Sequence, residues 1–338
     1  MTEFGAGPED QAAPPHRPLH TIEHPPELDV SVEKRVEEAE DVISLVLAPI
    51  GAPLPGWSPG AHIDLILEPG LERQYSLCGD PETQDTWRIA VLREPNGRGG
   101  SAWVHDRITA GSTLRVRGPR NNFPLVEAPS YLFIAGGIGV TPILPMIASA
   151  DRPGARWRLL YGGRRESSMA FVNDLTGGND RDRVVLWPED QHGLLPLDDF
   201  LATPEPGTAI YCCGPEPLIA AVEERCEVWP HGTLNVERFS PKPGALDGED
   251  RAFEVILEQS GLTLRVEDDE TIIQACERAG VDVASSCREG TCGTCETAVI
   301  EGVPDHRDSF LDADEQADNA TMMICCSRSR TPSLRLDL

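Results

Sequence analysis

Three cysteines lie close together at positions 287, 292 and 295, in the segment SSCREGTCGTCETAVIEG. Their spacing is C-x4-C-x2-C, and a fourth cysteine, Cys325, follows further along the chain. A plant-type [2Fe–2S] cluster takes four thiolate ligands with this kind of spacing. We therefore predict that Cys287, Cys292, Cys295 and Cys325 hold the metal of a [2Fe–2S] cluster.

Two glycines, Gly290 and Gly293, stand inside this loop. Without side chains they allow the backbone to fold tightly, so that amide N–H groups point at the sulfurs and help to set the cluster potential. A zinc site is the alternative, but zinc ligands usually come as two short-spaced pairs, and Cys325 is not half of a C-x2-C pair. The adjacent Cys326 competes for the fourth position, and the spacing favours Cys325.

Two further motifs could hold a flat, phosphorylated cofactor. In RQYS, residues 73–76, an aromatic ring beside an arginine and a serine can stack on a ring system and bond its edge. In NGRGGS, residues 96–101, glycines lead into a predicted helix whose free N–H groups favour a phosphate. Each motif alone is also typical of ordinary strands and turns; together they predict a flavin mononucleotide.

A nucleotide site is predicted where strands end in glycines. AGGIGVTP, residues 135–142, joins a strand to a helix, although it is not the usual G-x-G-x-x-G fingerprint. CCGPEP, residues 212–217, follows a later strand and places Cys213 at its carboxyl end, where ligands bind in open α/β sheets. A small buried core residue is the alternative interpretation of Cys213.

The elements that position these motifs change type along the chain. Short apolar or alternating runs between residues 28 and 126, such as HIDLILE and WRIAVLR, predict an antiparallel β-barrel. Between 127 and 239, strands such as RWRLLYGG alternate with helices, including one over 167–175, and predict an α/β domain with a parallel sheet. SPKPGALDGED, residues 240–250, is a predicted linker, and 251–338 begins with two strands and a helix that starts near Thr271.

Composition restricts the partners. The 338 residues carry a net charge of −27, with only two lysines, which disfavours nucleic acid and anionic membranes and favours a basic protein partner. The first 27 residues are predicted to be a disordered tail without a signal peptide. The uncharged run 128–150 is interrupted by glycines and prolines and is not expected to span a membrane. We expect a cytoplasmic monomer.

The ordered set of motifs resembles the phthalate dioxygenase reductase family of flavin and iron–sulfur reductases, within the ferredoxin reductase superfamily. The likeness covers about residues 28–338 and is strongest to vanillate demethylase reductases, because the chain ends in CCSRSR and LRLDL. The resemblance implies an FMN-binding β-barrel at 28–126, an NAD(P)H-binding domain at 127–239 and a C-terminal β-grasp ferredoxin domain at 251–338. This domain order implies FMN rather than FAD.

Site residues are carried over from the family motif by motif. Ser76, near flavin N5, and Cys213, beside the nicotinamide, are implied as catalytic residues. The implied contacts to FMN and nicotinamide are made by Arg73, Gln74, Tyr75, Ser76, Val91, Arg93, Gly99, Gly100, Ser101, Gly137, Gly139, Thr141, Cys213, Gly214 and Phe239. Arg164 and Arg165 could accept the 2′-phosphate of NADPH, but the family is mostly NADH-dependent, so NADH is expected.

The implied function is electron transfer from NADH through FMN and the cluster to a separate protein. The family predicts a Rieske-type aromatic oxygenase or demethylase as that partner, and a haem monooxygenase is the alternative. A non-catalytic zinc adaptor is a remote third interpretation. Residues 251–338 carry a net charge of −10, which would suit a partner with a basic docking face.

Overall fold

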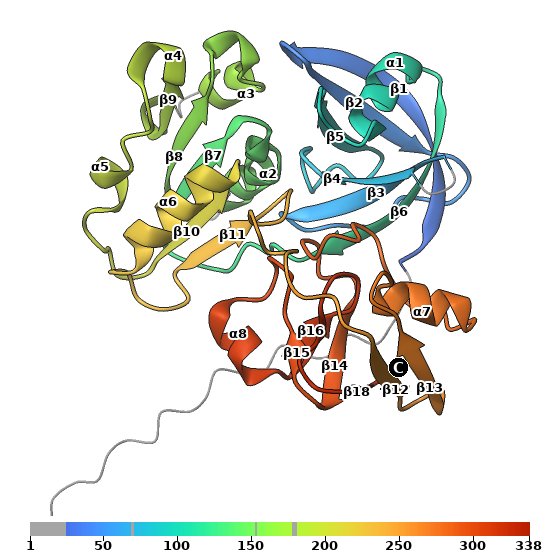
Figure 1. The fold of residues 1–338 in the computed structure, drawn as a ribbon. Coiled ribbons are helices and arrows are strands. Elements are labelled where there is room, and N and C mark those ends of the chain that lie inside the picture. The colour runs from blue at the N-terminus through green and yellow to red at the C-terminus, as the bar shows by residue number, and fades with distance from the viewer. Residues whose placement is uncertain (1–24, 69–70, 153, 178–180) are drawn as a thin grey trace, which may run out of the picture.

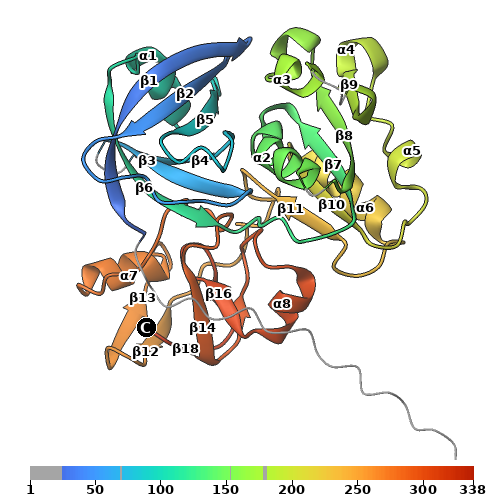
Figure 2. The same cartoon turned by 180° about the vertical axis from the view of Figure 1, so that it is seen from behind.

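The computed structural model describes residues 25–68, 71–152, 154–177 and 181–338. Most of the predicted tail, residues 1–24, lies outside these ranges. Three large sheets follow one another along the described chain, each with its own helices, and β15 (Pro304–Asp305) and β17 (Arg328–Ser329) form a small fourth sheet in the C-terminal unit. Figures 1 and 2 show the first two sheets side by side and the C-terminal unit beneath both of them.

The first sheet has six antiparallel strands in the order β4-β3-β6-β1-β2-β5. A bridge between Leu77 and Ile89 joins its two ends, so that the sheet closes into the predicted barrel. The alternating side chains of its strands fill the interior, where Ile63 and Leu65 are fully buried. The strands are β1 (Glu27–Ala39), β2 (Val42–Pro49), β3 (Ala61–Glu68), β4 (Leu71–Ser76), β5 (Trp87–Leu92) and β6 (Thr113–Asn121), with helix α1 (Gly100–Arg107) after β5.

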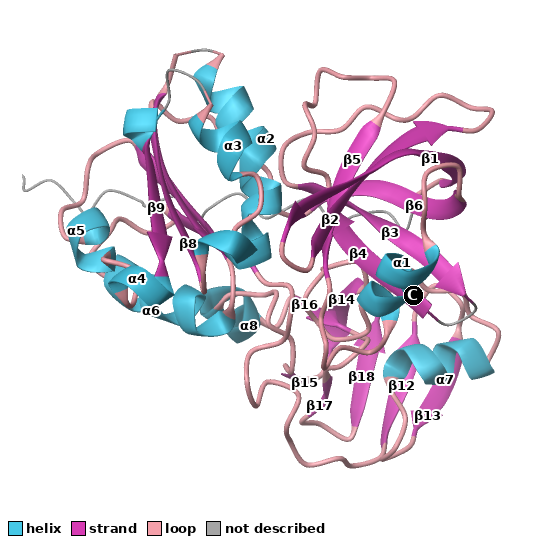
Figure 3. Ribbon diagram, turned by 90° about the horizontal axis from the view of Figure 1, so that it is seen from above, coloured by secondary structure: helices cyan, strands magenta, loops and turns pink. Residues whose placement is uncertain are grey.

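The second sheet has five parallel strands in the order β11-β10-β7-β8-β9, as expected for alternating strands and helices. Helices pack on both of its faces, and Figure 3 shows α2 on one side and α6 on the other. The strands are β7 (Ser130–Gly136), β8 (Arg156–Gly163), β9 (Val184–Pro188), β10 (Thr208–Cys213) and β11 (Leu234–Glu237), and the α-helices are α2 (Val140–Asp151), α3 (Val172–Thr176), α4 (Glu189–His192), α5 (Leu197–Leu201) and α6 (Glu216–Cys226).

One predicted helix of this unit is wrong in its extent. Residues 167–175 do not form a single helix, because Phe171 adopts a left-handed conformation with φ +62°. A short 3-10 turn, Glu166–Ser168, precedes it, and the α-helix begins only at Val172. The guanidinium of Arg88, from the barrel, lies 4.7 Å from the centre of the Phe171 ring. The left-handed conformation of Phe171, which local helix propensity does not predict, thus occurs where the barrel contacts this unit.

The third sheet is mixed, in the order β13-β12-β18-β14-β16, with β12 and β18 parallel. The predicted helix start is confirmed, since the Thr271 hydroxyl accepts a hydrogen bond from the Gln274 amide. The elements are β12 (Phe253–Leu257), β13 (Leu262–Val266), α7 (Ile272–Arg278), β14 (Glu296–Glu301), β15 (Pro304–Asp305), α8 (Ala313–Asp318), β16 (Thr321–Met323), β17 (Arg328–Ser329) and β18 (Ser333–Leu336). This α+β arrangement agrees with the predicted β-grasp class.

The apolar cores show how the units are joined. One core combines barrel residues, including Ala90 and Phe123, with residues of the parallel sheet such as Phe133 and Tyr211. The core of the C-terminal unit contains only residues from 253 onward. The barrel and the parallel sheet therefore share an apolar interface, whereas the third unit has a core of its own. Among the described residues, no helix has both the length and the apolar character needed to cross a membrane.

Candidate functional site

A cavity of about 520 Å³ lies where the three units meet, and its volume is in the range of small-molecule and cofactor sites. The barrel lines it with β4 and the start of α1, the parallel sheet lines it with Thr141 and the segment after β11, and the third unit lines it with the cysteine loop. Predicted site residues in its lining are Arg73, Gln74, Tyr75, Ser76, Gly100, Ser101, Thr141, Phe239, Cys287 and Cys292. The motifs therefore meet at one place.

The barrel wall of the cavity fits a flavin. Tyr75 is half-buried and burial raises the pKa of its phenol, so the ring stays neutral, while the hydroxyl-bearing Ser76 beside it is buried. The Arg73 guanidinium donates to the carbonyl oxygens of Glu72 at 2.7 Å and Arg98 at 2.9 Å. Burial, and then the nearby Arg98 charge, lower the pKa of Arg73. Two cations at one wall form a site that favours an anionic group such as a phosphate.

The turn that begins α1 supports the same interpretation. Gly99 caps the helix with φ +83°, and Gly100 packs so closely that an added Cβ would lie 2.5 Å from the Cγ atom of Arg73. The Ser101 hydroxyl accepts a hydrogen bond from the Glu94 amide at 3.0 Å, which orders the loop. Backbone N–H groups and the Arg73 side chain are thus next to each other, an arrangement suited to a phosphate.

Three carried-over flavin contacts, Val91, Arg93 and Gly99, do not line the cavity. Val91 is fully buried in the barrel core, and Arg93 turns outward to an ion pair with Asp106 at 2.7 Å. The reason is the two-residue period of the strand, which places Ala90 and Leu92 on the face that lines the cavity instead. The sequence predicted this strand correctly and assigned the wrong face of it.

The turn after β7 approaches the end of β10. An added Cβ at Gly139 would collide with the Cys213 carbonyl oxygen, so this position has room only for glycine. Gly137 has φ +55°, and Gly214 packs against Gly136. The Thr141 hydroxyl donates to the Ile138 carbonyl at 2.9 Å, which holds that side chain at the cavity. The glycines allow the close approach, but Gly137, Gly139 and Gly214 themselves do not line the cavity.

Cys213 is fully buried and lies behind Glu237, whose carboxylate oxygen Oε2 is 3.9 Å from the Cys213 sulfur. Burial raises the pKa of the Cys213 thiol well above its usual value, so it stays protonated. Burial also raises the pKa of Glu237, to about 8, and Glu237 lines the cavity. Glu237 was not among the predicted site residues, although it stands two positions before Phe239, which is 44% exposed and lines the same cavity.

The four predicted cluster cysteines form two contacting pairs. Cys287 lies close enough to Cys292 to raise the pKa of the Cys292 thiol, and Cys325 does the same to Cys295. The Glu289 amide donates to the Cys287 sulfur at 3.4 Å, as expected of a loop that presents N–H groups to cluster sulfurs. Among the described residues, no three His, Cys, Asp or Glu side chains are grouped to hold a single metal ion. Two pairs of thiols fit a cluster with two irons.

The backbone of the cysteine loop is tightly folded at its two glycines, as predicted. Both Gly290 and Gly293 have φ +70°, and an added Cβ on Gly293 would lie 2.5 Å from the Phe310 ring. The Cys326 sulfur points to the carbonyl oxygen of Met323 at 3.8 Å and lies beside Gly290. Of the two adjacent cysteines, Cys325 is the one that lies next to Cys295.

Residues 255–330 match the family model of the 2Fe-2S iron-sulfur cluster binding domain. This match favours the cluster over the zinc alternative. Phenoxybenzoate dioxygenase subunit beta of Ectopseudomonas oleovorans is 43% identical over 303 residues, which are 89% of this chain and 94% of that protein. The solved structure of phthalate dioxygenase reductase is 35% identical with a TM-score of 0.69, over 92% of this chain and 98% of that one.

The chain belongs to the phthalate dioxygenase reductase family. That solved structure is described as a modular structure for electron transfer from pyridine nucleotides to [2Fe–2S]. The chain is therefore an oxidoreductase, and the prediction of FMN, NADH and a [2Fe–2S] cluster agrees with this family.

A second solved structure broadens the comparison. An intact type IV self-sufficient cytochrome P450 monooxygenase is 42% identical with a TM-score of 0.83 over 92% of this chain. The present chain spans only 41% of that protein's length. This member of the phthalate dioxygenase reductase family is thus similar both to separate reductases and to a reductase fused to a haem enzyme.

Proposed function

We propose that this reductase takes electrons from NADH in the central cavity and delivers them one at a time to a separate oxygenase. The observation that carries the proposal is the single cavity lined by Tyr75 and Ser76, by Glu237 and Phe239, and by the cysteine loop. When bound, the flavin and the cluster supply the conversion of a hydride into single electrons. The residues of the chain supply binding, distance and exclusion of water.

The flavin would be held by the barrel wall. Tyr75 offers an aromatic face for the ring system, and Ser76 offers a hydroxyl to its edge, the role implied for it in catalysis. Arg73 and the N–H groups at Gly100 would hold the phosphate, assisted by Arg98. These groups suit a single terminal phosphate, as a flavin mononucleotide carries.

The nicotinamide would enter from the parallel sheet. Glu237 would lie beside its ring, with the buried Cys213 packed behind it, since both stand at the carboxyl ends of the adjacent strands β10 and β11. Arg165, which could serve a 2′-phosphate, lies 3.5 Å from the Glu40 carboxylate. The negative charge of Glu40 beside Arg165 would repel the 2′-phosphate of NADPH. This ion pair therefore supports NADH over NADPH.

The family relation indicates that the partner is an oxygenase component. Which kind of oxygenase it is forms part of this proposal. The likeness to separate reductase subunits of dioxygenase systems along nearly their full length supports a Rieske-type oxygenase. The likeness to the P450 fusion supports a haem monooxygenase as the second candidate. We place the Rieske-type oxygenase first because the relatives of matching length are separate subunits. We expect the reductase to act as a monomer.

Cofactor analysis and a partner assay test the proposal. Purified protein should hold about one FMN and two irons with sulfide per chain. It should reduce a purified Rieske oxygenase with NADH, and more slowly with NADPH. Extracted FAD would contradict the flavin assignment, and zinc in place of iron would contradict the cluster. Reduction of a haem monooxygenase but of no Rieske oxygenase would reverse the order of the two partners.

A further inference from the structure

The cysteine loop is attached to the barrel by polar contacts. The Asn122 amide donates to the Cys292 carbonyl, and Arg98 pairs with Glu289 at 2.9 Å. The buried core of the C-terminal unit includes no barrel residue among those the structure describes. The position of this loop relative to the flavin wall therefore depends on a few directional contacts rather than on a shared apolar core.

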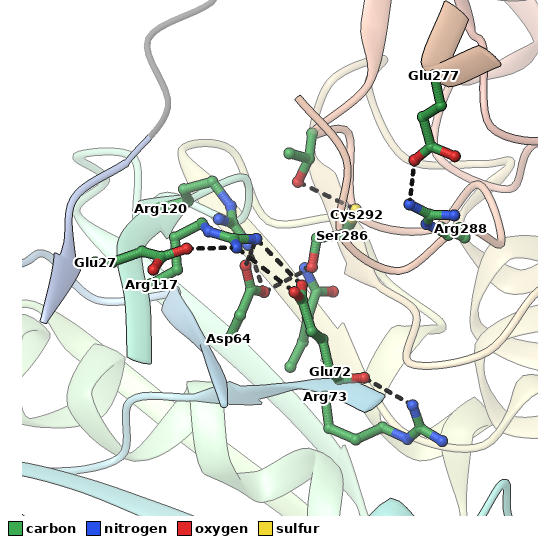
Figure 4. A network of polar contacts seen from close by, with 12 residues as sticks. Glu27, Asp64, Glu72, Arg73, Arg117, Arg120, Glu277, Ser286, Arg288 and Cys292 are labelled. Atoms are coloured by element: carbon green, nitrogen blue, oxygen red, sulfur yellow. Dashed lines mark hydrogen bonds and ion pairs between the residues drawn. The ribbon is translucent and has the colours of Figure 1, made fainter. Parts of the chain in front are cut away.

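One contact stands out because both of its partners come from the barrel strands β3 and β4, and β4 lines the cavity. The Ser286 hydroxyl, directly before the first predicted cluster ligand, donates to the Asp64 carboxylate at 2.7 Å. It also accepts a hydrogen bond from the Gln74 amide at 2.9 Å. Asp64 and Gln74 are register partners on β3 and β4, so their side chains share one face of the barrel. Figure 4 shows Ser286 reaching from the cysteine loop to Asp64.

Asp64 is a strong acceptor in a restricted position. It is fully buried, and the same oxygen that accepts from Ser286 accepts from the Arg120 guanidinium at 2.6 Å. Its other oxygen has no hydrogen-bond partner among the described residues and lies 4.0 Å from Arg117. A buried carboxylate with so few donors is strongly destabilised when one donor is removed. The hydrogen bond from the Ser286 hydroxyl is therefore important for stabilising the Asp64 charge.

We propose that Ser286 is a positioning residue that seats the cysteine loop on the flavin wall through Asp64 and Gln74, and so fixes the path of electrons out of the flavin. Gln74 directly precedes Tyr75, and Ser286 directly precedes Cys287, so one hydroxyl joins the two ends of that path. The inference rests on the proposed function and names a residue that neither the motifs nor the family resemblance assign to electron transfer.

The size of the effect follows from the contact. Removing a hydrogen bond to a charged group shifts an equilibrium by about tenfold or more, so Ser286→Ala should reduce the seated fraction of the loop by that factor. If the rate of electron transfer from flavin to cluster depends on the fraction of molecules with the loop seated, that rate should also fall by about tenfold. Flavin reduction by NADH should not change, since the parallel sheet and the barrel share their own interface.

The test is anaerobic stopped-flow spectroscopy of the holoprotein, with flavin reduction and cluster reduction recorded separately. Hydrogen exchange of residues 284–292 provides a readout that does not depend on turnover, and it should be about tenfold faster in Ser286→Ala. The cluster potential should be unchanged, which separates seating from tuning of the cluster. Ser286→Thr keeps a hydroxyl and should restore both rates. Ser285→Ala is the matched control, because Ser285 makes no side-chain hydrogen bond with a described residue.

Two results would overturn the proposal. One is wild-type cluster reduction in Ser286→Ala with full iron content, and the other is an equal loss in flavin reduction. If Ser286→Ala assembles no cluster, Asp64→Asn decides, because it leaves the loop sequence intact: slow cluster reduction supports seating and a wild-type rate refutes it. If the wild type itself shows no NADH-driven flavin reduction, the proposed function fails instead, so the two failures are distinguishable.

Discussion

Gly290→Ala tests the geometry of the cysteine loop directly. Gly290 has φ +70°, and an added Cβ would lie 2.5 Å from the Cys326 sulfur and 2.9 Å from the Asp308 Cα atom. The Cys326 sulfur can rotate away from the new methyl group, but the Asp308 Cα atom can move only if the surrounding backbone shifts. A left-handed residue with a side chain costs about 1–2 kcal/mol, and overpacking adds about 1–3 kcal/mol. We expect a loss of about 2–5 kcal/mol in the free energy of unfolding, together with failure to retain the cluster.

Gly280→Ala is the matched control for this substitution. Gly280 also lies in the C-terminal unit, has φ +76°, and has no atom within 4 Å of an added Cβ. Only the backbone cost of about 1–2 kcal/mol applies there, so the cluster should be retained. Thermal unfolding, with iron and sulfide analysis of the same samples, measures both effects. Equal unfolding midpoints and full iron content in both variants would refute the packing argument.

Three further predictions concern the cysteines and the buried acid. Cys325→Ser should lose the cluster and Cys326→Ser should keep it, by iron content, because only Cys325 contacts Cys295; the opposite pattern would reverse the assignment. Cys213→Ala should slow flavin reduction by NADH by at most about 100-fold and leave flavin-to-cluster transfer unchanged in stopped-flow measurements; an unchanged rate with a lower melting temperature would make Cys213 a packing residue. Burial raises the Glu237 pKa from 4.5 to about 8, so between these pH values the unfolded chain is ionised while the folded one keeps its proton, and stability relative to Glu237→Gln should fall as pH rises, by at most about 1.4 kcal/mol per pH unit. Denaturant titrations across this range check the slope, and a constant difference between the two proteins would contradict a raised pKa for Glu237.

Local patterns predicted the parts of the molecule that depend on near neighbours. The first three cysteines and the two glycines lie within one short loop, where spacing translates directly into geometry. Both glycines adopt a left-handed conformation, which lets the loop fold as tightly as predicted. Short runs that are apolar or alternating predicted the barrel strands β2 to β6. Strand β1 was missed because its second half, EKRVEEA, is highly charged, and its pairing with β2 has two register irregularities.

Contacts between distant segments could not be predicted from such patterns. The strand that contains Val91 was expected, but which of its faces meets the cavity depends on barrel closure, so Ala90 and Leu92 take the places expected of Val91 and Arg93. Ser286 meets Asp64 across 222 positions of sequence, and neither residue has a local signature. Glu237 looks like an ordinary charged residue until β11 pairs with β10 and places it against Cys213.

The central claim is that electrons from NADH pass through the flavin of the cavity to the cysteine cluster of the same chain. Anaerobic titration with NADH, followed by visible absorption and by electron paramagnetic resonance, tests it most directly. We expect uptake of about three electrons per chain, two on the flavin and one on the cluster, with the signal of a reduced [2Fe–2S] centre. A flavin that bleaches fully while the cluster remains oxidised, in protein with full iron content, would contradict it.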